Sequence, residues 1–148
     1  MLRVERSKVS FETVNVGPNG NWLYQGRPFT GIAYTLGPDG EVDSEQEFRD
    51  GLRWGPCWER YRSGQMYAES TFHRDVLHGR AREWHENGQL AEDGEYEFGI
   101  ALALRKWDEA GGLVEEYALT EADGNFALLQ SFRRIYGSGP DAEPPYGL

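Results

Sequence analysis

A repeat with a step of 24 residues organises most of this chain. Gly31, Gly55 and Gly79 form one column of the repeat, and Ala103 continues it. Three further columns keep the same register: Gly40, Gly64, Gly88 and Gly112; Val42, Met66, Leu90 and Val114; Tyr24, Phe48, Phe72 and Tyr96. Self-similarity at a fixed period is the signature of stacked structural units that cannot bury an apolar face alone.

Each unit has the form of a β-hairpin. In residues 48–70 the run PCWERY leads into Ser63–Gly64 and then into QMYAESTF, and in residues 72–94 the corresponding turn is Asn87–Gly88. Asn-Gly between such runs favours a type I′ turn, which needs positive φ at both central residues. A second set of turns, RDGLRWG and RDVLHG, joins one hairpin to the next. The repeat therefore predicts a mainly β protein with an elongated, twisted antiparallel sheet of about eight strands.

The repeat also predicts how the chain is divided. We expect a single domain over residues 1–148, a length that can bury a core of its own. Residues 1–23 form an N-terminal cap with a partial repeat, and residues 24–119 hold four hairpin repeats of 24 residues. Residues 120–137 are expected to be helical, and residues 138–148 have the Pro and Gly content of a flexible tail.

The expected C-terminal helix has both a spacing pattern and capping residues. Asp123 is a plausible N-cap, and Gly137 stands where a residue just past the helix end is often glycine. One face of the helix carries Phe126, Leu129, Phe132 and Tyr136. We expect the helix to cover the last strand edge or an open face of the sheet, because an exposed edge invites aggregation.

The charge balance restricts the possible partners. The formal net charge is -10, with 25 acidic and 15 basic residues. An acidic surface repels nucleic acid and anionic membranes, and it suits either a basic protein partner or solubility alone. No apolar run approaches the roughly 20 residues of a membrane span, and the N-terminus lacks the apolar core of a signal peptide, so we expect a cytoplasmic protein.

The segment WHENGQL, residues 84–90, places an imidazole beside carboxylates and so suggests an active site. A step of 24 residues, however, relates His85 to Tyr61 and Glu83 to Glu59. A catalytic base is not expected to recur as tyrosine in a sister unit, so His85 is better explained as a structural residue.

Other catalytic and metal-binding patterns are weak. His73, His78 and His85 match no compact zinc spacing. Cys57 aligns with Ala33 in the repeat and is interpreted as a small packed residue; as the single cysteine, it excludes an internal disulfide. We therefore expect no enzyme activity, no metal and no cofactor.

Acidic residues alternate along EVDSEQEF. Period 2 places Glu41, Asp43, Glu45 and Glu47 on one face of a strand. This row is explained either by a solvated outer face or by a surface that docks onto the basic cleft of a partner. The predicted partner-binding residues are Glu41, Asp43, Glu45, Glu47, Tyr67, Glu69, Asp93 and Glu95.

Two other residue classes border this surface. Arginines cluster between Arg49 and Arg82, and we expect most of them to pair with acidic residues across strands. Trp58 and Trp84 could be interface hot spots, but aromatic columns in a repeat sheet more often form the core, and we favour the core.

The motif Gly-x4-Trp-x3-Gly in GRAREWHENG, followed by Gln89–Leu90, resembles the variant MORN repeat of YwqK-type antitoxins. The spacing Phe-x6-Gly at Phe48 and at Phe72 fits the same pattern, and the resemblance covers roughly residues 24–118. It implies a bacterial antitoxin or immunity protein of a polymorphic toxin system that binds and neutralises a toxin domain. The alternative is a non-catalytic MORN-type scaffold that organises other proteins or lipid.

Overall fold

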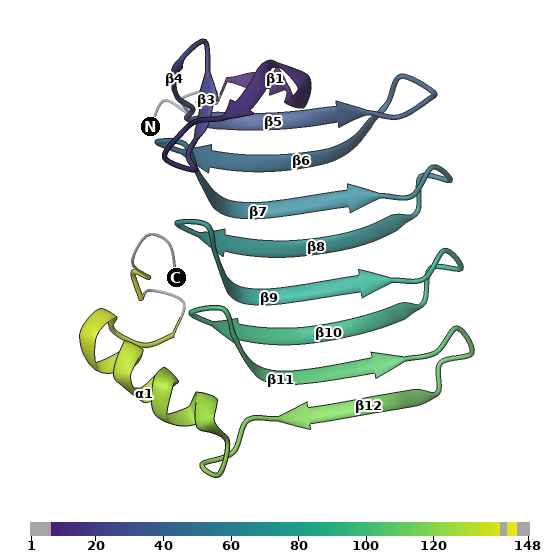
Figure 1. Ribbon diagram of the computed structural model, residues 1–148. Helices are drawn as coiled ribbons and strands as arrows, with labels where there is room; N and C mark the ends of the chain where they lie inside the picture. Colours follow the sequence, from purple (N-terminus) through teal and green to yellow (C-terminus); the bar gives the residue numbers. More distant parts are fainter. Residues whose placement is uncertain (1–6, 140–141, 145–148) are drawn as a thin grey trace, which may run out of the picture.

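The computed structural model describes residues 7–139 and 142–144, which form one long sheet, one small sheet and one α-helix (Figure 1). The long sheet comprises β1 (Lys8–Ser10), β5 (Gly31–Leu36), β6 (Val42–Arg49), β7 (Leu52–Arg60), β8 (Met66–His73), β9 (Val76–Trp84), β10 (Leu90–Glu97), β11 (Ile100–Trp107) and β12 (Leu113–Ala118), in that order. The small sheet comprises β2 (Val14–Val16), β3 (Trp22–Tyr24) and β4 (Arg27–Pro28), and it follows the short 3-10 helix η1 (Phe11–Thr13). The helix α1 spans Gly124–Tyr136.

The hairpin-repeat architecture is confirmed. Each strand from β5 to β12 pairs antiparallel with the next, which gives the predicted meander of hairpins. One pairing was not predicted: β1 lies parallel to β5, with Val9 opposite Ala33. Tyr24, which the repeat aligned with Phe48, lies in the small sheet. The first unit is therefore modified into a cap.

The turns on the right of Figure 1 share one geometry. In the loop after β7, the Gly64 N–H donates to the carbonyl of Tyr61 at 2.9 Å, and the Tyr61 N–H donates to the carbonyl of Gln65 at 2.9 Å. Among the residues of this loop only the glycine has positive φ, which is 87° at Gly64. The equivalent Gly88, in the loop after β9, has φ of 86°. The loop therefore has three residues closed by a left-handed glycine, and the type I′ turn predicted here is wrong.

Type I′ turns occur at the opposite end of the strands. Both central residues have positive φ in the pairs Asp50–Gly51, Arg74–Asp75 and Phe98–Gly99. Left-handed backbone costs a non-glycine residue about 1–2 kcal/mol, so local contacts must offset it. The carboxylate of Asp75 accepts a hydrogen bond from the Arg53 N–H at 2.8 Å, and the ring of Phe98 is buried beneath α1.

The last hairpin is shifted by one residue. Its left-handed glycine is Gly111, with φ 88°, so the predicted assignment of this role to Gly112 is wrong. Leu113, and not Val114, lies opposite Trp107 and continues the apolar column. The cause is the length of β11, which has 8 residues where β7 and β9 have 9.

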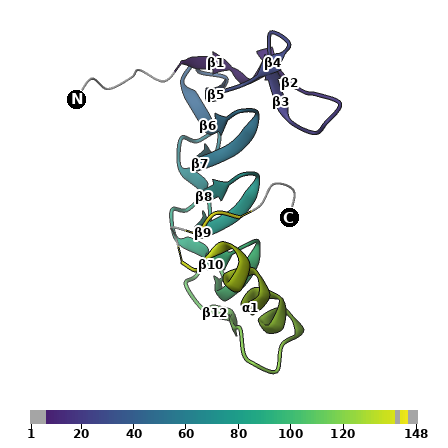
Figure 2. The ribbon, with the colours of Figure 1, turned by 90° about the vertical axis from the view of Figure 1, so that its left-hand side faces the viewer.

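The glycines in the middle of the units bend the strands. Gly55 and Gly79 have φ of 82° and 111°, and the pairing register shifts beside each of them. A side chain at Gly55 would bring its Cβ to 2.8 Å from a carboxylate oxygen of Glu47. These β-bulges curl the sheet, as Figure 2 shows.

Among the described residues, the clusters of buried apolar side chains lie at the two ends of the sheet and not along its middle. The first consists of Val14, Phe29, Ala33 and Phe48, and the second of Phe98, Ile100, Leu129 and Ala142. The small sheet covers the first cluster and α1 contributes to the second, and both lie on the same side of the long sheet (Figure 2). The predicted column of core aromatics is thus divided into two caps.

The predicted caps of the helix are confirmed. The Asp123 side chain accepts a hydrogen bond from the Asn125 N–H at 2.9 Å, and the Gly137 N–H donates to the carbonyl of Arg133 at 3.0 Å. Leu129 is buried, and Phe132 packs on Phe98 with ring centroids 5.4 Å apart. The helix therefore covers one face of the sheet beside the β10–β11 turn and leaves the edge of β12 open.

The segment after the helix is partly docked. The ring of His78 donates through Nε2 to the carbonyl of Gly139 at 2.8 Å, and Ala142 is 3% exposed. Pro144 is fully buried. The prediction of a flexible tail is wrong for these residues, and residues 140–141 and 145–148 lie outside the described part of the chain.

A buried ion pair fixes the helix to the sheet. The Arg133 guanidinium donates to both carboxylate oxygens of Glu97 at 2.8 Å, and Glu97 is 8% exposed. These hydrogen bonds lower the pKa of Glu97 and raise that of Arg133. Removal of the cation would leave a buried carboxylate without its ion-pair partner, which is a destabilising change.

We predict that Arg133→Gln lowers the free energy of unfolding by roughly 2–3 kcal/mol. The matched control is Arg134→Gln, one position along the helix, where the exposed guanidinium donates to the Ser131 hydroxyl and a change within about 0.5 kcal/mol is expected. Urea unfolding at neutral pH measures both. Equal losses in the two variants would contradict an anchoring role for the ion pair.

Candidate functional site

A row of mostly charged side chains crosses one face of the long sheet. The cross-strand register places each member opposite the next, and from β6 to β12 they are Glu45, Trp58, Glu69, Arg82, Asp93, Arg105 and Glu116. We call this row the charge ladder and its side of the sheet the ladder face. From Glu69 onward the sign alternates from strand to strand, and opposite charges directly across strands are stabilising.

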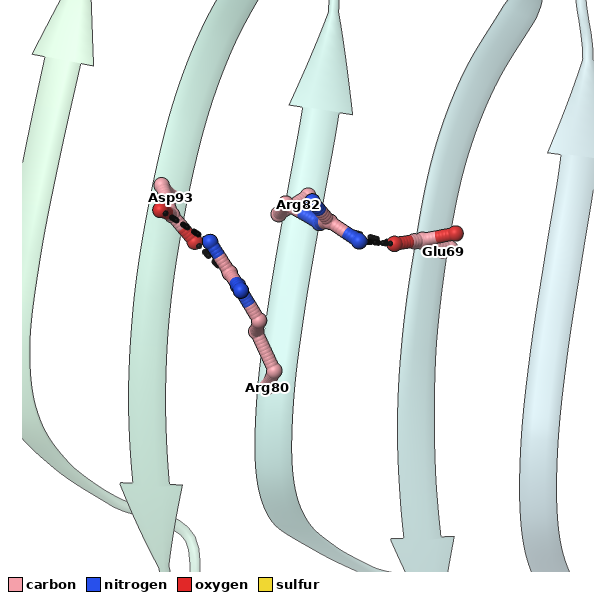
Figure 3. A network of polar contacts seen from close by, with 4 residues as sticks. All are labelled: Glu69, Arg80, Arg82 and Asp93. Atoms are coloured by element: carbon pink, nitrogen blue, oxygen red, sulfur yellow. Dashed lines mark hydrogen bonds and ion pairs between the residues drawn. The ribbon is translucent and has the colours of Figure 1, made fainter.

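Every acid of the charge ladder has a nearby cation. Figure 3 shows the pairs made by Glu69 and Asp93. Arg80 donates two hydrogen bonds to Asp93, at 3.0 and 2.9 Å, and they lower the pKa of that carboxyl. Arg82 pairs with Glu69 across β8 and β9. The predicted pairing of arginines with acidic residues is confirmed for Arg80 and Arg82.

The ends of the ladder are balanced in the same way. Nζ of Lys8, in β1, lies 2.9 Å from Oε1 of Glu45, and Nε of Arg105 lies 3.5 Å from Oε2 of Glu116. All of these pairs are at least partly exposed, so each adds little to the stability of the fold. Their main consequence is electrostatic: the ladder face is close to neutral despite its many carboxylates.

The four acids predicted to share one face do not do so. Glu47 is only 6% exposed and lies against Gly55. A register shift between Thr35 and Leu36 creates a bulge at Asp43, whose carboxylate turns to accept a hydrogen bond from Thr35. Glu41 is exposed beside the preceding turn. Strict alternation failed because a bulge adds one residue to the strand.

The other predicted docking residues have different environments. Tyr67 occupies the same bulge position one repeat later, and its ring packs on Tyr61 with centroids 4.9 Å apart. Glu69 and Asp93 lie in the charge ladder, and Glu95 is exposed on the same face, opposite Arg80. The structure thus brings Glu45, Glu69, Asp93 and Glu95 to one face.

A second row, which the sequence reasoning missed, lies on the opposite face. It runs through Ser44, Glu59, Ala68, Glu83, Glu92, Lys106 and Glu115, and we call it the acidic row. Glu83 stands directly across from Glu92, an arrangement that is unfavourable for folding. Lys106 lies 3.7 Å from Glu92 and 3.6 Å from Glu115 and is the single cation of the row.

Residues of the acidic row line two hollows in the surface of the sheet. The first, of about 340 Å³, lies between Trp22 and the strands that carry Cys57 and Glu59. The second, of about 210 Å³, lies among Phe72, Glu83 and other residues of β8 to β10. This face therefore combines unbalanced acids with accessible aromatic and small side chains. The signal available in the sequence was the 24-residue spacing of Glu59 and Glu83.

The region around His85 ties one repeat to the next. The Tyr61 hydroxyl donates to the carbonyl of Trp84 at 2.8 Å, and His85 Nε2 donates to the carbonyl of Trp107 at 2.9 Å. The two rings thus perform the same structural task in successive units, which agrees with their predicted equivalence. Burial raises the pKa of the Tyr61 hydroxyl.

The two tryptophans of the repeat are not core residues. Trp58 and Trp84 are half-buried, and neither belongs to the apolar clusters formed by the described residues. Each carries a guanidinium over its ring: Arg60 lies 4.9 Å from the centroid of Trp58, and Arg82 lies 5.5 Å from that of Trp84. The core assignment is wrong because none of the described helices or strands packs over these two side chains as a second layer.

The histidines are arranged for packing. His73 and His78 have ring centroids 6.3 Å apart, and Nδ1 of His78 accepts a hydrogen bond from the Phe98 N–H at 3.0 Å. His85 lies at the opposite end of the strands. Within residues 7–139 and 142–144, no three His, Cys, Asp or Glu side chains are grouped closely enough to hold a metal ion. Burial raises the pKa of the Cys57 thiol.

Comparison with known proteins adds a relative. Immunity protein YwqK of Bacillus subtilis (strain 168) is 33% identical over 111 residues, which cover 75% of this chain and 72% of that protein. The chain belongs to the YwqK family. No protein-family model and no solved structure matches the sequence. For this YwqK-family chain, none of the helices that the structure describes is both long and apolar enough to cross a membrane.

We predict that His73 makes the stability of this YwqK-family protein depend on pH near neutrality. Burial, with smaller contributions from His78, Arg74 and Arg49, lowers the pKa of His73 from its ordinary 6.5, whereas Glu143 acts in the opposite direction. The pKa of His73 is lower in the folded protein than in the unfolded chain. The contribution of His73 to stability is therefore fully present above pH 6.5, and it is lost as the pH falls below that value.

The measurement is thermal unfolding at pH 7.5 and pH 5.5. The wild type should have a lower Tm at pH 5.5 than at pH 7.5, and His73→Phe, which keeps a ring against Trp54, should lose less. Asp93 and Glu97 have lowered pKa values, so their contribution is lost only in more acid solution. Identical losses in the two proteins would refute the role of His73.

Proposed function

We propose that this protein is an immunity protein that neutralises a cognate toxin domain by direct binding, without catalysis. The observation that carries the proposal is its relationship with a protein named as an immunity protein, which extends over 72% of that protein. An array of hairpins whose described residues form apolar clusters only at its two ends suits the task of presenting a large surface to a partner. We place the interaction in the cytoplasm, with a toxin of the polymorphic class.

Electrostatic attraction supports a basic surface on the toxin. The chain has a net charge of -10, and an acidic inhibitor is steered toward a basic cleft at a rate that falls with salt. The charge ladder is already balanced internally, so its acids contribute mainly at the rim of an interface. Acids without an ion pair among the described residues, such as Glu41, Glu59, Glu83 and Glu95, contribute more.

The docking residues that we propose keep the members of the predicted set that are exposed or partly exposed, except Asp43. They are Glu41, Glu45, Tyr67, Glu69, Asp93 and Glu95. We add Glu59 and Glu83 of the acidic row, which lies on the face opposite the charge ladder, so a partner that uses both sets contacts both faces of the sheet. Asp43 and Glu47 are assigned to the structure of the sheet, because one satisfies Thr35 and the other is buried.

The direct test is coexpression with a candidate toxin domain, chosen from the genes that flank the gene of this protein. We expect cells that produce the toxin domain to survive when this protein is present, and the two purified proteins to form a stable complex. Cell death in the presence of folded protein, or the absence of a complex, would refute the proposal.

We further predict that charge reversal slows association. The variants Glu41→Lys with Glu95→Lys, and Glu59→Lys with Glu83→Lys, should each lower the association rate about tenfold at low salt, with the difference fading at high salt. The control is Glu12→Lys with Glu121→Lys, which changes the net charge equally at exposed sites away from both rows. A control that slows association as much as the other two variants would overturn the assignment of these rows.

A further inference from the structure

The two outer edges of the long sheet are treated differently. At the first edge, β1 pairs with β5 and the small sheet packs beside it. At the last edge, β12 is the terminal strand, and no described segment pairs with its outer side (Figure 1). Alternate N–H and C=O groups of such a strand point outward and are free to pair with another chain.

The side chains of β12 leave this edge accessible. Leu113 is 52% exposed and Val114 is 64% exposed. The strand has 6 residues, LVEEYA, and contains neither the proline nor the lysine that natural proteins use to block an edge. The Tyr117 hydroxyl donates to Asp123 at 2.7 Å, which holds the strand in place beside the start of α1. An ordered, partly apolar edge is thus preformed.

The charge pattern of the sheet indicates which strand fits there. The charge ladder ends with the sequence acid, cation, acid at Asp93, Arg105 and Glu116. On the other face the acidic row ends in the same order at Glu92, Lys106 and Glu115. Both rows therefore end in a carboxylate on β12. A further strand paired with β12 would continue the alternation of charge if it carried a cation opposite each of these two carboxylates, one on each face of the sheet.

The same two carboxylates disfavour a second copy of the chain. Glu115 and Glu116 lie in the middle of β12. Any antiparallel register that overlaps the whole strand places the acids of one copy across from, or next to, those of the other. Like charges in these positions are destabilising, so the edge rejects itself and remains available to a basic strand.

We propose that the outer edge of β12 docks an extended basic segment of the toxin, which adds to the sheet as a further strand. Two adjacent cations of that segment face Glu115 and Glu116, one on each side of the sheet, and an apolar residue packs on Leu113. Backbone hydrogen bonds supply affinity in such strand addition, and side chains supply specificity. This inference rests on the proposed function, because the strand belongs to the toxin.

A first experiment needs no toxin and uses this chain as its own probe. The variant Glu115→Lys with Glu116→Lys carries a basic edge, so its mixture with the wild type should form a salt-sensitive dimer in sedimentation velocity, while each protein alone stays monomeric. The control variant, Glu12→Lys with Glu121→Lys, should leave the mixture monomeric. A mixture that stays monomeric although the circular dichroism spectrum shows a folded variant, or a control that also dimerises, would overturn the proposal.

A second experiment needs no variant to fold. Amide hydrogen exchange of the wild-type chain is measured alone and with the toxin domain identified by coexpression, and exchange in Leu113–Ala118 should slow by about tenfold or more in the complex. A complex with unchanged exchange in this strand would overturn edge docking while the proposed function stands. The absence of any complex would overturn both.

Discussion

Backbone pairing between consecutive strands is the interaction on which this protein depends. The described residues place buried apolar clusters only at the two ends of the sheet, so the hairpins in the middle have no opposing layer to hold them in register. Each is held instead by its neighbours, through the strand ladders and through ties such as His85 to the carbonyl of Trp107. Repeat arrays are stable in this way because each unit is stabilised by the next.

The single-layer middle explains the unusual surface. Where both faces of a strand meet water, charged side chains can occupy alternate positions on each face, and the cross-strand neighbour then decides whether a charge is balanced. The ladder face is balanced, with Arg82 between Glu69 and Asp93. The acidic row is not, since Glu83 faces Glu92. An open sheet with one neutral and one acidic face is well suited to present a charged surface to a partner.

Much of the architecture could be predicted because it depends on local rules. The N-cap Asp123 and the terminal Gly137 follow from hydrogen bonds within one turn, and both were predictable. The spacing of Gly40, Gly64 and Gly88 is set by loop closure and was equally readable. The position of the last glycine was not, because the doubled Gly111–Gly112 conceals the residue that β11 lacks.

The candidate surface was less predictable, because it depends on bulges and on neighbours that are distant in sequence. Alternation placed Asp43 and Glu47 with Glu45, but a bulge turned Asp43 aside, and Glu47 was buried against Gly55. A carboxylate in a strand is balanced or unbalanced according to the strand beside it. No local pattern contains that information.

The sequence by itself determined the repeat, the hairpins, the helix with its caps and the acidic character of the chain, because each depends on residues within one turn or one repeat. Tertiary structure decided the rest. It assigned each carboxylate to a balanced or an unbalanced row, placed α1 over a face of the sheet, and left the edge of β12 open. Those outcomes depend on strand register and on which surfaces meet, and only the folded chain brings such distant residues together.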